Sequence, residues 1–387
     1  MEWFCYLDEE KVIEWRHWLH QHPELSFQEV ETSQYIEKTL QEMGNIEISR
    51  PTKTSVLGII RGKKPGKTIG LRADIDALPV REEADVSYRS QNLGVMHACG
   101  HDTHAAMLLG AAWVLSQITD ELSGTIKLIF QHAEEKNPGG AQEIIATGCL
   151  DDVDYFYGSH VFAPMDSGVI QTISGPCMAA VDELSLKIQG RGSHGSMPEK
   201  SIDPIMVGAS IVMNINQIVS RNVPPLERVV ISVGKFISGT AANIIPDTAE
   251  LAFTVRTTTK EMRELTEKRL REVIDGICKA HGATYELLYD KGYNPLVNDE
   301  ACTALAKTVA IKLFGEEACK DALPQLGGED FSYYLEKAPG TFVFIGGGGF
   351  DEGCPFVNHH PKFQILDKTL IVGTKMYVGF ALEAAKV

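Results

Sequence analysis

Basic residues are scarce in this sequence, with 36 lysines and arginines against 52 aspartates and glutamates among 387 residues and a formal charge of −16. This balance argues against nucleic acid or an anionic membrane as the main partner. No stretch approaches the roughly 20 apolar residues of a membrane span. The first residues, M-E-W-F-C-Y-L-D-E-E, lack the basic region that opens a signal peptide, so we expect none.

Closely spaced cysteine pairs are also missing. The eight cysteines are scattered, without a C-x-x-C or a dense framework. This distribution is typical of reduced thiols, so a cytoplasmic protein is expected. Hydrophobic residues make up 44% and charged residues 23% of the chain, which is ordinary for a globular protein. Because 387 residues exceed the length at which one core usually keeps growing, we expect two domains.

One dense polar cluster is present at residues 96–104, which read M-H-A-C-G-H-D-T-H. Three imidazoles, a thiol and a carboxylate are the ligand types of zinc and its transition-metal neighbours. The next residues, 105–115, are almost all apolar, and a helix that is apolar around its whole circumference is expected to be buried. The cluster is therefore predicted at the N-terminal end of a buried helix, with Asp102 as its N-cap.

Strand-like and helix-like segments alternate through most of the chain, which predicts an α/β fold with a mostly parallel sheet. Residues 8–43 predict two helices with a break near Pro23, and His17, His20 and His22 are expected on the surface without chemistry. Strands are predicted at 55–61, 68–74, 125–130 and 155–158. In such sheets, binding sites lie beyond the carboxyl ends of the strands.

Residues 180–294 have a different texture. The segment 183–189 alternates apolar and polar residues, which predicts a half-exposed antiparallel strand. The elements that follow complete the order βαββαβ of a ferredoxin-like domain, and the α/β pattern then returns. We therefore expect a catalytic domain formed by residues 1–179 and 295–387, interrupted by an inserted α+β lid domain at 180–294.

Polar residues that could do chemistry fall at the predicted strand ends. They are Asp74, Asp76, Glu134, Glu135 and His160. Adjacent carboxylates at a buried strand end repel each other unless a cation or proton lies between them, so one glutamate as metal ligand and its neighbour as general base would resolve the conflict.

Two adjacent imidazoles, His359 and His360, follow late in the chain, and only one of them could bind a given metal because neighbouring side chains diverge. Altogether the candidates exceed the three protein ligands of a single catalytic zinc and suit a two-metal hydrolytic site.

Eight motifs occur in an order that resembles the M20 metallopeptidase family, and more narrowly its amidohydrolase branch of hippurate hydrolases, N-acyl-amino-acid amidohydrolases and auxin-conjugate hydrolases. The motifs are R-A-D-I-D-A-L-P, H-A-C-G-H-D-x-H, Q-x-A-E-E, S-H-V-F, G-x-x-S-H-G-S-M-P, N-I-I-P-D-T, G-G-E-D-F and H-H-P-x-F. The resemblance covers essentially the whole chain. Departures at His132, Lys136 and Glu199 leave the substrate open.

The resemblance implies a role for ten residues. The implied metal ligands are Cys99, His101, Glu135, His160 and His359. Glu134 matches the general base, and Asp76 matches an aspartate that supports the metal centre. His194 matches a lid-domain histidine that reaches a neighbouring subunit's site and steadies the oxyanion, while Asn243 and Arg256 match lid residues that contact the substrate carboxylate.

The implied activity is hydrolysis of the amide bond of N-acyl amino acids, with two divalent ions (manganese, zinc, nickel or cobalt) and a homodimer formed through the lid domain. An M20-type dipeptidase or carboxypeptidase acting on short peptides is the alternative within the same chemistry. A cysteine hydrolase with Cys99 as nucleophile is a second alternative. A non-catalytic binding protein is a third, which the retention of every implied ligand disfavours.

Overall fold

The computed structural model describes residues 2–386, and the chain divides into two compact units. Unit 1 comprises Met1–Gly175, Val297–Leu323 and Asp330–Val387, and unit 2 comprises Pro176–Leu296 and Pro324–Glu329. The short strands β7 (Gly175–Met178) and β14 (Leu296–Asn298) lie at the borders of the units in the sequence. No helix among residues 2–386 is both long and apolar enough to span a bilayer.

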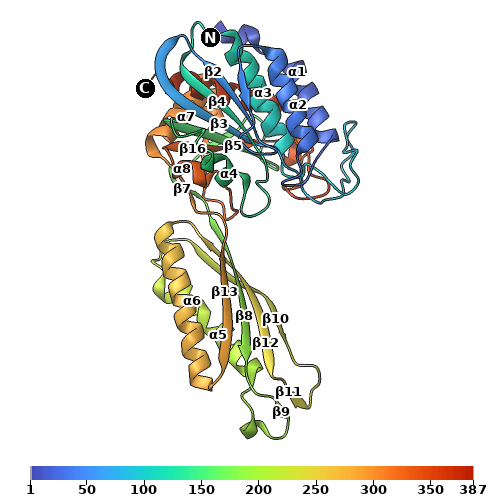
Figure 1. The fold of residues 1–387 in the computed structure, drawn as a ribbon, viewed down its shortest axis with the longest axis vertical. Coiled ribbons are helices and arrows are strands. Elements are labelled where there is room, and N and C mark those ends of the chain that lie inside the picture. The colour runs from blue at the N-terminus through green and yellow to red at the C-terminus, as the bar shows by residue number, and fades with distance from the viewer. Residues whose placement is uncertain (1, 387) are drawn as a thin grey trace. The chain divides into compact units, whose positions relative to one another are not determined.

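Unit 1 contains an eight-stranded mixed sheet in the order β1-β2-β4-β3-β5-β16-β6-β15 (Figure 1). Its strands are β1 (Glu47–Ser49), β2 (Val56–Arg61), β3 (Lys64–Asp74), β4 (Ser123–Gln131), β5 (Tyr155–Phe162), β6 (Ile170–Thr172), β15 (Cys319–Asp321) and β16 (Gly340–Gly346). The four central strands β4, β3, β5 and β16 are parallel, so their carboxyl ends meet at one edge of the sheet. The predicted α/β fold with a largely parallel centre is confirmed.

Helices cover both faces of this sheet. They are α1 (Glu9–Gln21), α2 (Val30–Met43), α3 (His101–Gln117), α4 (Gly140–Ala146), α7 (Glu300–Phe314), α8 (Ser332–Leu335) and α9 (Lys368–Ala384), with short 3-10 helices η1 (Glu2–Tyr6), η4 (Glu316–Ala318) and η5 (Phe350–Glu352). The connections β3-α3-β4 and β4-α4-β5 cross the sheet in opposite directions. Because such crossovers are right-handed, α3 and α4 lie on opposite faces.

Helix α3 is buried around its circumference, as its apolar sequence predicts; Leu108 and Leu109 are fully buried. Burial of each such side chain contributes about 1.5–3 kcal/mol. The helix begins at His101, and its N-cap is Gly100 at φ +90°. A side chain at Gly100 would collide with Val161, whose Cγ2 would lie 2.4 Å from the added Cβ. This close approach places a glycine at the start of the helix, directly after Cys99.

Two predictions near this helix are wrong. Asp102 lies in the first turn rather than at the N-cap, because its carboxylate binds Arg16 at 3.1 Å and His20 at 2.9 Å. His20 is only 3% exposed, not a surface residue, because this pairing and a second one with Glu82 at 3.1 Å hold its ring inside.

Unit 2 contains a four-stranded antiparallel sheet in the order β10-β12-β8-β13 (Figure 1). Its elements are β8 (Ala180–Gln189), β9 (Ser193–His194), η2 (Pro198–Lys200), α5 (Pro204–Gln217), η3 (Ile218–Asn222), β10 (Val229–Ser238), β11 (Ile244–Ile245), β12 (Thr248–Thr257), α6 (Lys260–His281) and β13 (Thr284–Lys291). The predicted ferredoxin-like order is confirmed. Leu184, Leu186 and Ile188 alternate inward and pack with residues of α5 and α6, as the strand pattern predicts.

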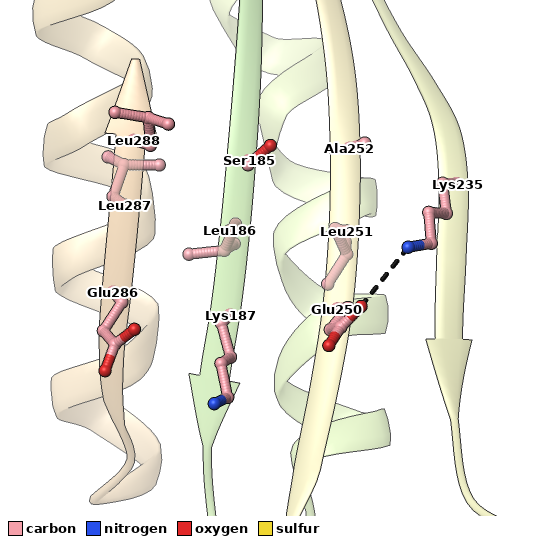
Figure 2. Close-up of a pocket in the computed structure, with 10 residues that line it drawn as sticks. All are labelled: Ser185, Leu186, Lys187, Lys235, Glu250, Leu251, Ala252, Glu286, Leu287 and Leu288. Carbon is pink, nitrogen blue, oxygen red and sulfur yellow. Dashed lines mark hydrogen bonds and ion pairs between the residues drawn. The ribbon is translucent and has the colours of Figure 1, made fainter. Parts of the chain in front are cut away.

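The other face of this sheet is open and slightly hollowed (Figure 2). The hollow has a volume of about 340 Å³, and its lining includes the small side chains of Ser185 and Ala252. Charged side chains also line it, and two of them form an ion pair, with Lys235 Nζ 3.3 Å from Glu250 Oε2. No metal-ligating candidate from the sequence lines this hollow.

Candidate metal centre

Side chains from several segments of unit 1 converge at the carboxyl edge of its sheet. Three groups, whose ligand atoms lie within 4.8 Å of one another, share members: Cys99, His101 and His160; Cys99, Glu135 and His359; and His101, Glu134 and Glu135. The structure therefore brings together all five predicted ligands and the predicted base. The strands β4 and β5 end at the edge where α3 begins, so residues 134, 135 and 160 meet residues 99 and 101 there.

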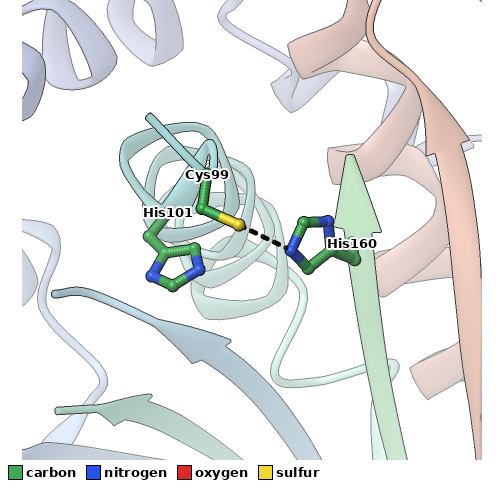
Figure 3. Close-up of side chains that lie close together, drawn as sticks. All are labelled: Cys99, His101 and His160. Carbon is green, nitrogen blue, oxygen red and sulfur yellow. Dashed lines mark hydrogen bonds between the residues drawn. The ribbon is translucent and has the colours of Figure 1, made fainter. Parts of the chain in front are cut away.

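The first group contains Cys99, His101 and His160, all buried (Figure 3). The ring of His160 donates from Nδ1 to the Val161 carbonyl at 2.8 Å, which leaves Nε2 at 3.3 Å from the Cys99 Sγ. His101 Nδ1 lies 3.1 Å from Asp76 Oδ1, which leaves Nε2 for a ligand. Metal-ligating histidines usually donate their other ring nitrogen to a carboxylate or carbonyl in this way.

The second group adds His359 and Glu135. His359 Nε2 lies 3.2 Å from the Cys99 Sγ and 3.2 Å from Glu135 Oε1. The backbone N–H of His359 donates to the Ala98 carbonyl at 2.7 Å, so its loop is fixed against the segment that carries Cys99. The neighbouring His360 is instead stacked on Phe356, with ring centroids 4.4 Å apart.

Asp76 organises two members of the cluster at once. Besides its contact with His101, its Oδ2 accepts hydrogen bonds from the backbone N–H of Glu135 at 3.0 Å and from the Ser26 hydroxyl at 2.7 Å. Asp76 therefore orients one ring and the acidic loop together. Ser26 gave no signal in the sequence, because a single serine before a helix has many ordinary explanations.

Glu134 lies beside the proposed ligands. It is 7% exposed, and its Oε2 is 4.0 Å from His101 Nε2. This position suits a group that exchanges protons with a molecule at the centre, because the carboxylate lies close to the ligand atoms.

The other imidazoles of the 96–104 segment have different surroundings. His104 forms a group with Asp74 and His101 whose ligand atoms lie within 4.8 Å of one another, but its ring nitrogens have protein partners. His104 Nδ1 donates to Asp74 Oδ1 at 2.6 Å, and its Nε2 accepts the backbone N–H of Val161 at 2.9 Å. Both ring nitrogens are therefore engaged, and Asp74 is also paired with Arg72 at 2.6 Å. His97 is 1% exposed, and burial lowers its pKa to about 4.

The residues present fit a divalent cation. His101 Nε2 is buried without a hydrogen-bond partner among residues 2–386, and Glu135 Oε1 faces the His359 ring nitrogen at 3.2 Å. Burial lowers the pKa of His101, but the carboxylates of Asp74 and Asp76 outweigh it and raise that pKa to about 10. Burial also raises the pKa of the Cys99 thiol, and the charges of Glu135 and Glu134 raise it further. The cluster therefore has a negative potential that favours a cation.

The remaining candidates lie in unit 2. His194, in β9, is paired across to Ile244, the residue after Asn243, and the Asn243 carbonyl accepts the Gly195 N–H at 2.8 Å. Arg256 lies near the far end of β12, opposite Val181, whereas the first residue of β12, Thr248, lies opposite Gln189. Eight residues of strand span roughly 26 Å, so Arg256 does not lie beside Asn243 or His194 within a single copy of unit 2.

An α/β sheet with thiol, imidazole and carboxylate groups gathered at its carboxyl edge defines a candidate metalloenzyme. The model of peptidase family M20/M25/M40 matches residues 70–383, so the chain belongs to this family and the resemblance drawn from the motifs is confirmed. Similar proteins include an N-acyl-L-amino acid amidohydrolase of Geobacillus stearothermophilus, 49% identical over 74% of this chain and 78% of that protein. Another is thermostable carboxypeptidase 1 of Saccharolobus solfataricus, 40% identical over 97% of this chain and 95% of that protein.

Among solved structures, the Bacillus subtilis YXEP protein, described as a dinuclear metal binding peptidase from the M20 family, superposes with a TM-score of 0.85. It is 36% identical, and the match covers 97% of this chain and 98% of that chain.

Proposed function

We propose that this protein is a metal-dependent amidohydrolase that cleaves the amide bond of N-acyl amino acids. The observation that carries the proposal is the convergence of Cys99, Glu135 and three histidines in groups that share members, one of which includes Glu134. A relative at 49% identity that is named for this activity supports it.

The ions would be held by five side chains: Cys99, His101, Glu135, His160 and His359. When bound, two divalent ions would lower the pKa of a water molecule and polarise the acyl carbonyl. The mixed thiolate, imidazole and carboxylate donors suit manganese, zinc, nickel or cobalt.

Glu134 accepts the proton of the attacking water and later returns it to the leaving amine, as a general base and then a general acid. Asp76 keeps the His101 ring in one orientation through the contact at 3.1 Å. It also accepts a hydrogen bond from the backbone N–H of Glu135, which fixes the loop so that the two adjacent glutamates have different roles.

We assign three residues of unit 2 to contacts with the substrate. Arg256 suits the α-carboxylate, because a guanidinium binds a carboxylate through two parallel hydrogen bonds. Asn243 contributes a further polar contact, and His194 steadies the oxyanion. Because Arg256 lies roughly 26 Å along β12 from the end that carries the β9–β11 pair, we propose that the two ends serve different active sites of a homodimer.

Exposed apolar side chains on unit 2 support a second copy as partner. Met206 and Met213 on α5 are 59% and 72% exposed, and Ile237 on β10 is 57% exposed.

No disulfide joins any of the cysteines within the described residues, which supports the cytoplasmic location that we propose.

The test is amine release by metal-reconstituted protein from a panel of N-acetyl and N-benzoyl amino acids and of free-amino dipeptides. Turnover of the acylated compounds with little turnover of the dipeptides is expected. The reverse preference would support the second candidate, an M20-type dipeptidase or carboxypeptidase, which is favoured by the 40% identity to a thermostable carboxypeptidase.

A further inference from the structure

A buried carboxyl outside the metal-binding groups contacts the acidic loop. Glu29 directly precedes α2 and is fully buried. Its Oε1 accepts two backbone hydrogen bonds, from the N–H of Phe27 at 2.9 Å and from the N–H of Ala133 at 2.8 Å. The second bond connects two segments more than a hundred residues apart in the sequence, and Ala133 is the residue before Glu134.

Both donors have an unusual backbone conformation. Phe27 has φ +66° and Ala133 has φ +54°, in the left-handed region that side-chain-bearing residues rarely adopt. Such strain persists only where the surroundings fix it, and it clusters at functional sites. The same oxygen of Glu29 holds the N–H of both strained residues.

Helix capping does not account for this carboxyl. Although Glu29 occupies the N-cap position of α2, its side chain caps no N–H of that helix. Its hydrogen bonds instead go to Phe27 and to the loop that carries Glu134. On the other side of Glu134, Asp76 Oδ2 accepts the N–H of Glu135 at 3.0 Å. Two buried carboxyl groups therefore hold the backbone immediately before and immediately after Glu134.

We infer that Glu29 is a positioning residue for Glu134. By holding the Ala133 N–H, it keeps the chain in the left-handed turn that directs the next side chain towards the metal-binding groups. Asp76 alone fixes only the far side of the loop, so without Glu29 the loop can relax at Ala133 and move the Glu134 carboxylate. This inference rests on the proposed function, in which Glu134 is the general base.

The test compares Glu29→Ala and Glu29→Gln with a matched control, Glu24→Ala. Glu24 also binds a backbone N–H near the start of α2, that of Thr32 at 2.8 Å, but it makes no hydrogen bond to residues 133–135. Activity is measured on an N-acyl amino acid that the wild type cleaves, together with metal content by elemental analysis and thermal unfolding.

Glu29→Ala is expected to lower kcat by about 10²-fold, the cost of misplacing a reacting group by about 1 Å, with KM and metal content nearly unchanged. Glu29→Gln is expected to recover most of kcat, because its amide oxygen can accept the same two N–H bonds. Glu24→Ala should keep the wild-type kcat. If Glu29→Ala does not fold, Glu29→Asp takes its place, since its shorter side chain cannot reach both donors.

A wild-type kcat in the Glu29→Ala protein would overturn the inference. So would a loss of kcat that Glu24→Ala shares, that Glu29→Gln fails to recover, or that follows a loss of metal. Wild-type protein that cleaves no member of the panel would instead refute the proposed function itself.

Discussion

The carboxylate of Asp74 accepts a hydrogen bond from the His104 ring at 2.6 Å, and both residues are fully buried. The same carboxylate pairs with Arg72 at 2.6 Å. Arg72 also pairs with Asp330 at 2.8 Å, so Asp74→Ala leaves one Arg72 N–H and the His104 ring N–H buried without this acceptor. At about 1–3 kcal/mol for each unsatisfied donor, and more for a charged one, the free energy of unfolding should fall by about 2–5 kcal/mol. Urea unfolding of the metal-free protein measures this change.

The control for Asp74→Ala is Asp120→Ala. Asp120 pairs with Lys63 at the surface, where both side chains are more than two-thirds exposed. Exposed pairs contribute about 0–1 kcal/mol, so this variant should unfold almost as the wild type does. Equal effects of the two substitutions would show that the buried network is not held together by its charges.

Removing the metal ions with a chelator should abolish activity and lower the stability of the fold. Without the ion, His101 Nε2 is buried without a hydrogen-bond partner, and any ion that binds only the folded state stabilises it by mass action. The melting temperature should fall with chelator, and activity should return when manganese, zinc, nickel or cobalt is added singly. The most effective ion identifies the preferred metal. Activity that persists in chelator would favour a cysteine hydrolase, although two glutamates beside Cys99 oppose its thiolate.

The two adjacent glutamates should respond differently to substitution. Glu134→Gln is expected to lower kcat by about 10²–10⁴-fold, the usual contribution of a general base, with the metal content unchanged. Glu135→Ala is expected to lower the metal content, because Glu135 Oε1 lies 3.2 Å from His359 Nε2 within the cluster. Elemental analysis and steady-state kinetics on both variants separate the roles. Substantial turnover by Glu134→Gln would refute its role as base.

Local patterns allowed much of this molecule to be predicted. The all-apolar segment 105–115 predicted a buried helix, and the acidic pairs predicted the sheet edge at which a site forms. Both signals arise from neighbours in the sequence. The alternation at 183–189 likewise predicted the inward face of β8.

Contacts between distant segments could not be predicted, except where the family resemblance implied a shared metal site. Asp102 reads as a helix cap until α1 supplies Arg16 and His20, which are 86 and 82 residues away. Glu29 gives no signal in the sequence, and only the fold places Ala133 against it. In each case the partner is specified by the tertiary fold, so no local pattern contains it.

Glu29 should also make stability depend on pH. Burial and the charge of Asp76 raise the pKa of Glu29 from its ordinary 4.5 to about 7. Between these values the folded state binds more protons than the unfolded state, so the free energy of unfolding falls as pH rises. The glutamine of Glu29→Gln cannot titrate. The free energy of unfolding of this variant, measured relative to the wild type, should therefore increase by about 3 kcal/mol between pH 4.5 and pH 7. Urea unfolding of both metal-free proteins at several pH values measures this difference, and a constant difference would contradict the shift.

A homodimer in which unit 2 serves the neighbouring active site can be tested by mixing two inactive proteins. Glu134→Gln lacks the base but retains His194, whereas His194→Ala retains the base. If His194 acts across the dimer, each mixed dimer contains one complete site, because the Glu134→Gln subunit supplies its histidine to the other subunit. Random exchange in a symmetric dimer should then restore about a quarter of the wild-type activity.

If His194 serves its own subunit, no mixed dimer contains a complete site and the mixture stays inactive. The exchange is confirmed by tagging one variant and recovering both chains on the tag, so that inactivity cannot be ascribed to unmixed dimers. His194 Nδ1 lies 2.8 Å from the Ser196 hydroxyl, and Ser196→Ala changes the same turn without removing the imidazole. A Ser196→Ala protein that keeps most of its activity would show that the loss in His194→Ala comes from the ring rather than from the turn.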